Sequence, residues 1–98
     1  MSDRLAGVRP LLEAFVAVRV ETCRRDEADA IEYSISCYLN RGELRYLRAA
    51  LLLAYETALP RMMPWRHPDE IRAWTRVRDA ARVVEAAVLS TSRAPETP

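Results

Sequence analysis

The residues best able to do chemistry in this chain are its one histidine, His67, and its two cysteines, Cys23 and Cys37. A thiol activated by an imidazole is a strong nucleophile, but no sequence feature brings these three residues together. A single His without a Cys-x-x-Cys pair does not match any zinc-site spacing. The two glycines, Gly7 and Gly42, each stand alone and do not form a phosphate-binding loop. We therefore expect no cofactor, no metal and no enzymatic activity.

A second chemical arrangement is the spacing of Arg61 and His67, which are separated by five residues. This spacing resembles the Arg-x(4–6)-His signature of HEPN-type ribonucleases, all-α proteins. The resemblance implies an arginine that steadies phosphate charge and a histidine that transfers protons near neutral pH. In that family a polar residue follows the arginine and the motif lies on a helix. Here Met62 follows and Pro64 interrupts any helix, so a HEPN-like ribonuclease is the third of our functional hypotheses.

The charge of the chain is balanced overall but uneven along its length. All fifteen basic residues are arginine, against fourteen acidic residues, which gives a net charge of +1. The absence of lysine is typical of a GC-rich genome, so we expect a bacterial source. The acidic residues of one short run are Asp26, Glu27, Asp29 and Glu32. Because the stretch 61–82 is rich in arginine, a molecule with two opposite poles could self-associate or bind a charged partner.

Nucleic-acid binding is the second functional hypothesis. It would use a basic face within residues 61–82, with Trp65 as a surface for base stacking. The arginines that would contact phosphate are Arg61, Arg66, Arg72 and Arg76. A net charge near zero and the neighbouring acids Asp69 and Glu70 count against this function.

The apolar spacing predicts an all-α fold, a small up-down bundle of four helices. The expected helices cover about residues 10–24, 27–40, 43–59 and 68–90. Pro10 and Pro68 are each suited to the first turn of a helix, and the sequence Asn40-Arg41-Gly42 is a typical helix end. We expect residues 1–9 to be a short lead-in, residues 10–90 to be one domain and residues 91–98 to be a flexible tail.

The alternative fold is α+β, because two segments also show the alternation of a strand. In residues 15–22, every second residue from Val16 to Thr22 is valine or threonine. In residues 31–39, every second residue from Ile31 to Leu39 is aliphatic, aromatic or cysteine. These two segments could form a β-hairpin. However, the connection between them contains no Gly, Pro or Asn, which hairpin turns usually need. The sequence therefore favours helices in both segments.

Protein–protein contact is the function that the composition favours most. The expected helix 43–59 is apolar nearly all round its middle, so it must either lie at the centre of the bundle or face another subunit. The following segment concentrates methionine, tryptophan and arginine, which interfaces favour. The residues we expect to bind a partner are Leu52, Tyr55, Met62, Met63, Trp65 and Arg66.

We therefore predict a cytoplasmic, non-enzymatic interaction protein that is an adaptor, a regulator or a small subunit of a larger complex. Its partner would be another protein or a second copy of itself. No stretch is long and apolar enough to suggest a membrane segment, because Glu13 and Arg19 interrupt the first apolar run.

Overall fold

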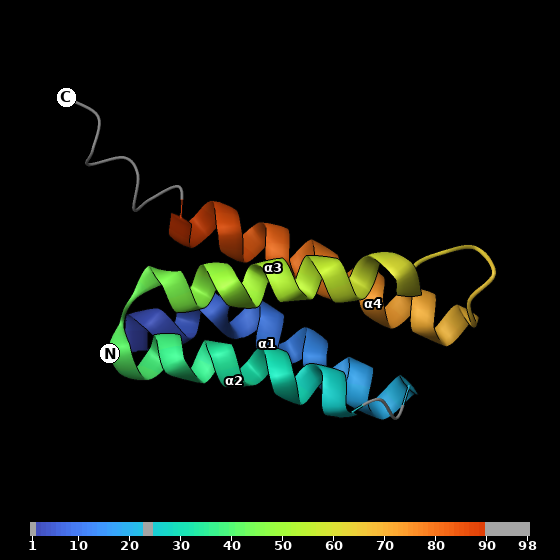
Figure 1. Cartoon of the computed structure of the whole chain (residues 1–98), viewed down its shortest axis with the longest axis horizontal. Coiled ribbons are helices and arrows are strands. Elements are labelled where there is room, and N and C mark those ends of the chain that lie inside the picture. The colour runs from blue at the N-terminus through green and yellow to red at the C-terminus, as the bar shows by residue number, and fades with distance from the viewer. Residues whose placement is uncertain (1, 23–24, 90–98) are drawn as a thin grey trace.

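The chain forms four antiparallel α-helices in a computed structural model, which describes residues 2–22 and 25–89 (Figure 1). The helices are α1 (Ser2–Thr22), α2 (Arg25–Arg41), α3 (Leu44–Arg61) and α4 (Pro68–Val84), and α4 continues as a π-helical turn, η1 (Glu85–Leu89). Each helix runs back along the one before it. The predicted up-down bundle of four helices is therefore confirmed. The predicted tail, residues 91–98, lies outside the described residues.

The alternative β-hairpin of residues 15–22 and 31–39 is wrong, because the described residues contain no strand. Burial in α2 follows the helical period: Ile31 and Ile35 are fully buried, whereas Tyr33 between them is 72% exposed. In α1, Phe15 is buried and Val16 is exposed. Some of the residues that suggested strands, such as Val16 and Tyr33, thus lie on the solvent face of a helix.

The first helix begins at Ser2, eight residues earlier than predicted, and carries Pro10 in its interior. Proline removes one intrahelical hydrogen bond, so contacts with other elements must hold this helix together. Val8 is fully buried one turn before Leu11 and continues the core face of α1. An added Cβ on Gly7 would lie 3.1 Å from Val88 Cγ2, which shows how closely the start of α1 packs on η1. These tertiary contacts explain why the predicted lead-in is helical.

The connection between α2 and α3 is a tight turn at Gly42, as the sequence predicted. Gly42 has a φ of 76°, a left-handed conformation that favours glycine, and its N–H donates to Tyr38 O at 2.7 Å. Arg4 of α1 lies over this turn and donates to Leu39 O at 2.7 Å. A cation at the C-terminal end of α2 also complements the helix dipole. The start of α1 is therefore fixed to the α2–α3 turn.

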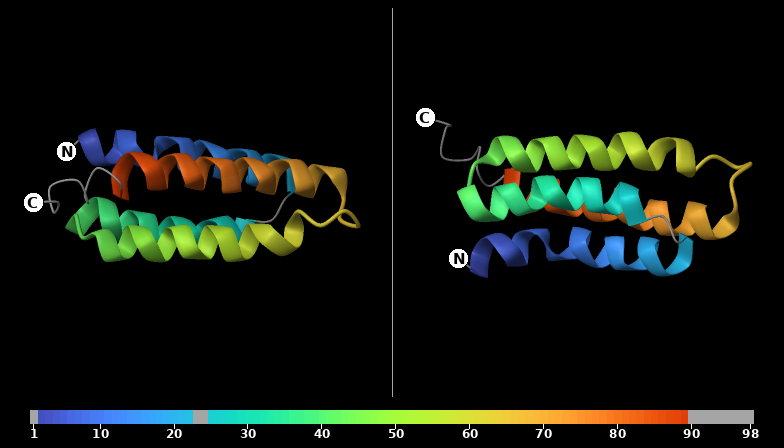
Figure 2. Two further views of the ribbon diagram at one scale, coloured as in Figure 1. Left: turned by 90° about the horizontal axis from the view of Figure 1, so that it is seen from above. Right: turned by 60° about the horizontal axis from the view of Figure 1, so that its bottom comes forward.

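The core lies between the four helices, and it contains no buried charged residue among those described. α1 packs most extensively on α4, and α2 on α3 (Figure 2). The largest fully buried side chains are Trp74, Phe15, Leu11, Ile31, Ile35 and Leu47. Burying residues of this size contributes roughly 1.5–3 kcal/mol each, so the core is the main source of stability.

The third helix is not central, although its sequence allowed that arrangement. α3 contacts only α2 and α4 extensively, so it occupies a corner of the bundle like every other helix. Its buried face consists of Leu47, Ala50, Leu51, Ala54 and Ala58. The apolar residues on its other face, including Leu52 and Leu59, remain in contact with solvent.

Candidate interaction surface

The turn between α3 and α4 (residues 62–67) projects from one end of the bundle (Figure 1). It is held by short-range hydrogen bonds: Met62 N donates to Leu59 O at 3.2 Å, and Arg66 N donates to Met63 O at 3.0 Å. The Arg66 side chain also donates to Pro60 O at 3.2 Å. The turn therefore has a defined conformation from which its side chains project.

The side chains of this turn differ in how far the chain covers them. Met62 packs partly against the core and Met63 is half-buried. Trp65 is 78% exposed, the largest exposed fraction among the large apolar residues described. Trp65 is thus not covered by the described part of its own chain. Leaving so large an apolar ring in water forgoes a substantial hydrophobic stabilisation.

His67 is the N-cap residue of α4, as its position before Pro68 predicted. Its Nδ1 accepts a hydrogen bond from Asp69 N at 3.1 Å. Histidine is not a favoured capping residue, but here the imidazole itself satisfies one free donor of the first turn. Nδ1 can accept this hydrogen bond only in the neutral imidazole, in the tautomer that carries its proton on Nε2.

Arg61, the other residue of the ribonuclease-like pair, binds within the bundle. Its guanidinium donates to Thr57 O at 2.9 Å and forms an ion pair with Glu27 of α2. It also lies over the Trp74 ring, 5.6 Å from the ring centroid. Arg61 and His67 therefore have separate structural partners, and the described contacts do not join them.

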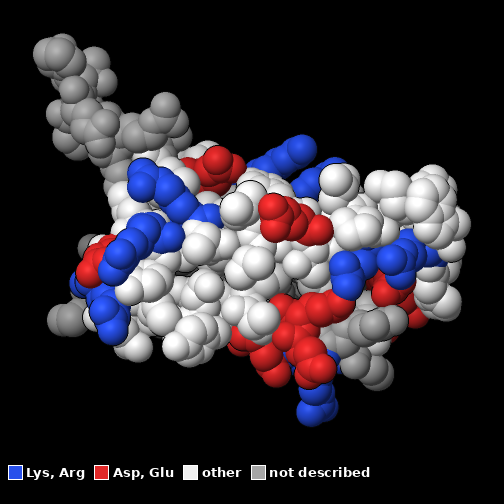
Figure 3. All heavy atoms as spheres, viewed as in Figure 1, with Lys and Arg blue, Asp and Glu red and all other residues white. Residues whose placement is uncertain are grey.

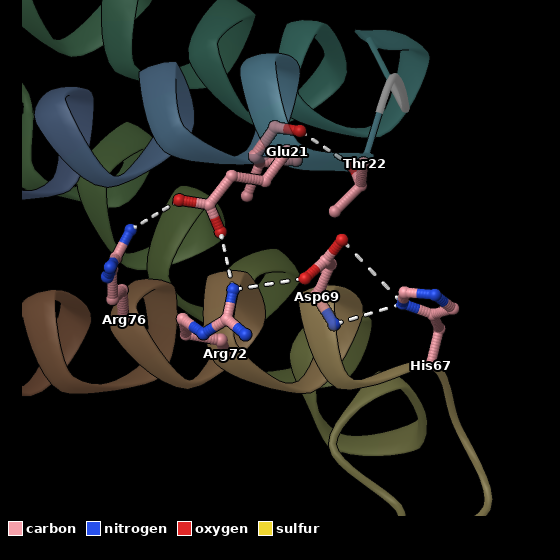
Figure 4. A network of polar contacts seen from close by, with 7 residues as sticks. Glu21, Thr22, His67, Asp69, Arg72 and Arg76 are labelled. Atoms are coloured by element: carbon pink, nitrogen blue, oxygen red, sulfur yellow. Dashed lines mark hydrogen bonds and ion pairs between the residues drawn. The ribbon is translucent and has the colours of Figure 1, made fainter.

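Polar contacts connect α1 to the start of α4 (Figure 4). Arg76 donates to Glu21 Oε2 at 2.8 Å, and Arg72 Nη1 lies 3.7 Å from Glu21 Oε1. Arg72 also donates to Asp69 at 3.0 Å. Glu21, Asp69 and His67 contribute to the lining of a hollow of about 400 Å³ beside these contacts.

Each of the four arginines predicted to contact nucleic acid has a carboxylate partner in its own chain. Arg61 pairs with Glu27, Arg66 lies 3.7 Å from Glu70, and Arg72 and Arg76 both meet Glu21. A phosphate group would have to compete with these carboxylates. The arrangement therefore leaves less positive charge available than the sequence of residues 61–82 suggests.

Three of the four acids at the start of α2, Glu27, Asp29 and Glu32, are also paired within the chain. Arg19 of α1 donates to Asp29 at 2.6 Å and to Glu32 at 2.7 Å. Hydrogen bonds to Glu32 and then to Asp29 raise the pKa of the Arg19 guanidinium. The acids and arginines that looked like two separate poles in the sequence are thus largely matched across helix pairs.

The outward face of α3 is the larger apolar surface. Its exposed residues are Arg45, Arg48, Ala49, Leu52, Leu53, Glu56, Leu59 and Pro60. Leu52 is 58% exposed and Leu59 is 62% exposed. Side chains other than Arg, Asp and Glu cover most of the middle of the surface in Figure 3. A helix face in contact only with water is normally polar, so the apolar composition of this face is unusual.

Leu52 and Tyr55 also line a groove of about 590 Å³ between α3 and the end of α4. Tyr55 Oη donates to Glu85 Oε1 across the groove at 2.7 Å. Burial, followed by the contact with Glu85, raises the pKa of Tyr55 to about 12. The sequence did not predict this pair, since thirty residues separate its members and no local pattern joins them.

Comparisons with known proteins do not assign the chain to a family. No protein-family model, curated protein or solved structure matches it significantly. Among residues 2–22 and 25–89, none of the helices combines the length and the apolarity needed to cross a membrane. The same residues contain no group of three or more His, Cys, Asp or Glu arranged to hold a metal ion. The functional argument therefore depends on the surface alone.

Proposed function

We propose that the protein is a small non-enzymatic interaction module, an adaptor, regulator or small subunit, that binds its partner through α3 and the following turn. The observation that carries the proposal is the 78% exposure of Trp65 in a turn whose backbone is hydrogen-bonded. Tryptophan is the residue type most enriched among those that dominate binding energy. A partner that covered Trp65 would recover the apolar burial that the folded chain leaves unused.

The exposed apolar residues of α3 support binding through the same surface. Leu52 and Leu59 lie seven residues apart, so they share one side of the helix and lead toward the turn that holds Trp65. Arginine and methionine, which interfaces favour, flank this path at Arg48 and Met63. The proposed surface thus combines an apolar centre with charged edges.

The contacts of Arg61 and His67 support a non-enzymatic function. Arg61 binds Glu27 and Thr57, and His67 caps α4 through its acceptor nitrogen. Each residue therefore has a structural task that accounts for its position. Of the two cysteines, Cys37 is half-buried on α2, and Cys23 lies outside the described residues.

Site-specific photo-cross-linking in the source cells tests this proposal. A benzophenone amino acid at position 65 would lie within the proposed surface, and the same group at position 79 on α4 is a matched exposed control. We expect discrete protein adducts from position 65 and none of those adducts from position 79. Identical adducts at both positions, or none at position 65, would contradict an interaction surface at this end of the protein.

A further inference from the structure

Three residues on the outward face of α3 follow one another at four-residue intervals: Arg48, Leu52 and Glu56. All three are exposed. Arg48 and Glu56 form no ion pair with any described residue, whereas Arg72 and Arg76 on α4 are both paired. The two charges are opposite in sign and lie about 6 Å along the helix axis on either side of Leu52. This pattern is self-complementary about Leu52.

A two-fold axis through Leu52 would bring two α3 helices together in antiparallel orientation. Leu52 would then contact Leu52 of the second copy, which covers an apolar side chain that is 58% exposed in the monomer. Arg48 would lie level with Glu56 of the second copy, and the symmetry would repeat this pair on the other side of the axis. Long side chains across adjacent helices can form such ion pairs.

The residues farther from the axis fit the same arrangement. Leu59 and Arg45 lie seven residues on either side of Leu52, so each would face the other across the dimer. The Arg45 guanidinium is held by Glu43 at 2.7 Å and lies over the Tyr46 ring. Its aliphatic stem can therefore cover Leu59 while its charge stays in water. Ala49, close to the axis, is small enough to let the two helices approach.

The charges also decide between orientations. In a parallel pair in the same register, Arg48 would face Arg48 and Glu56 would face Glu56, which places like charges opposite each other. Only the antiparallel pair converts both contacts into attractions. The same property favours a second copy over an unrelated partner, because the face already contains both halves of the complementary pattern.

We infer that the protein forms a two-fold symmetric dimer through antiparallel contact between the α3 helices of two copies, centred on Leu52. This inference rests on the proposed function, since it names the partner of the α3 surface. The contact runs along a helix of 18 residues, which is about 27 Å long. Trp65 lies beyond the end of α3 and is outside the central contact.

Charge exchange between positions 48 and 56 tests the register directly. The variants are Arg48→Glu, Glu56→Arg and the double variant Arg48→Glu/Glu56→Arg, studied by analytical ultracentrifugation from micromolar to near-millimolar concentration. Each single variant turns both symmetric ion pairs into repulsions, so we expect its dimer dissociation constant to rise about tenfold or more. The double variant restores both pairs and should dimerise like the wild type.

A mixture of the two single variants gives a second, independent result. Arg48→Glu carries two acids at positions 48 and 56 and Glu56→Arg carries two arginines there, so the mixture should form a heterodimer that is tighter than the homodimer of either variant. Arg9→Glu on α1 and Asp79→Arg on α4 change the same charges on other exposed surfaces and should leave dimerisation unchanged. Circular dichroism checks that every variant is folded.

Three results would overturn the inference: a wild type that stays monomeric at all concentrations, a dimer that the single variants do not weaken, or a double variant that does not recover. The photo-cross-linking at position 65 separates this failure from that of the proposed function. A monomer whose position 65 still gives discrete adducts binds a different protein, and the antiparallel dimer is then wrong while the interaction module remains.

Discussion

The outward faces of α3 and α4 differ in what their side chains contact. On α4, Arg72 and Arg76 meet Glu21 of α1, so the charged face of that helix helps to hold the bundle together. On α3, Leu52 and Leu59 contact solvent, and Arg48 on the same face has no ionic partner among the described residues. Both helices occupy equivalent corners of the bundle.

Helices in equivalent positions can therefore use their solvent faces differently. On α4, Arg72 and Arg76 are paired with Glu21, so these charges are used within the chain. α3 carries apolar residues on both faces, so the bundle can bury only one of them. An apolar face that the fold leaves exposed adds nothing to the stability of the monomer, but it is available for association.

The largest difference between the two helices is expected when one new charge is placed on each of them. Leu52→Glu on α3 and Val83→Glu on α4 alter residues of nearly equal exposure, 58% and 55%. We expect Leu52→Glu to raise the dimer dissociation constant about 100-fold, because two carboxylates would meet at the axis in place of an apolar contact. Val83→Glu should change it less than about twofold. Sedimentation velocity measures both, and equal weakening by the two variants would show that the α3 face has no special role.

A smaller effect is expected from removing one carboxylate on each side of the comparison: Glu21 of α1, which pairs with the arginines of α4, and Glu56 of α3. Glu21→Gln leaves Arg72 and Arg76 without their shared partner, so we expect the free energy of unfolding to fall by about 1 kcal/mol. Glu56→Gln on α3 should change it by less than about 0.3 kcal/mol when the protein is monomeric. Urea denaturation of the monomer at low concentration measures the difference. A loss that is as large for Glu56→Gln would mean that α3 also uses its charges internally.

The last effect is confined to alkaline pH and concerns Tyr55, which lines the groove between α3 and the end of α4. Its pKa is raised from 10.0 to about 12 by burial and by Glu85, so the folded state keeps the phenol protonated longer than the unfolded state does. The resulting stabilisation is complete below about pH 10 and is lost as the pH rises through 12. Between these values the stability should fall more steeply in the wild type than in Tyr55→Phe. Identical slopes in alkaline denaturation would show that the Tyr55–Glu85 contact does not persist in solution.

The fold could be predicted because local residues mark where several of its helices begin and end. Gly42 ends α2 and Pro68 begins α4, and both effects depend on the backbone of one residue. The start of α1 could not be predicted in the same way. Arg4 reaches Leu39 and Val8 enters the core only after the four helices have packed, so the contacts that hold a helix across Pro10 are absent from the local sequence.

The candidate surface could be predicted only in part for the same reason. The composition indicated that Leu52 and Trp65 exceed what one small core can cover, and both are exposed. The arginines of α4 also seemed available in the sequence, but their partner Glu21 lies about fifty residues away in the chain. The order of the helices around the bundle decides which charged side chains form ion pairs. The periodicity of the sequence does not give that order.

The two tryptophans give this protein a pair of built-in optical probes. Trp74 is fully buried beneath Arg61, and its indole N–H has no hydrogen-bond partner among the described residues. Its fluorescence should therefore lie at short wavelength and shift only when the bundle unfolds. Trp65 is in water and should emit at long wavelength and respond to quenchers in solution. One emission spectrum can thus separate unfolding of the bundle from the covering of its surface, without any label.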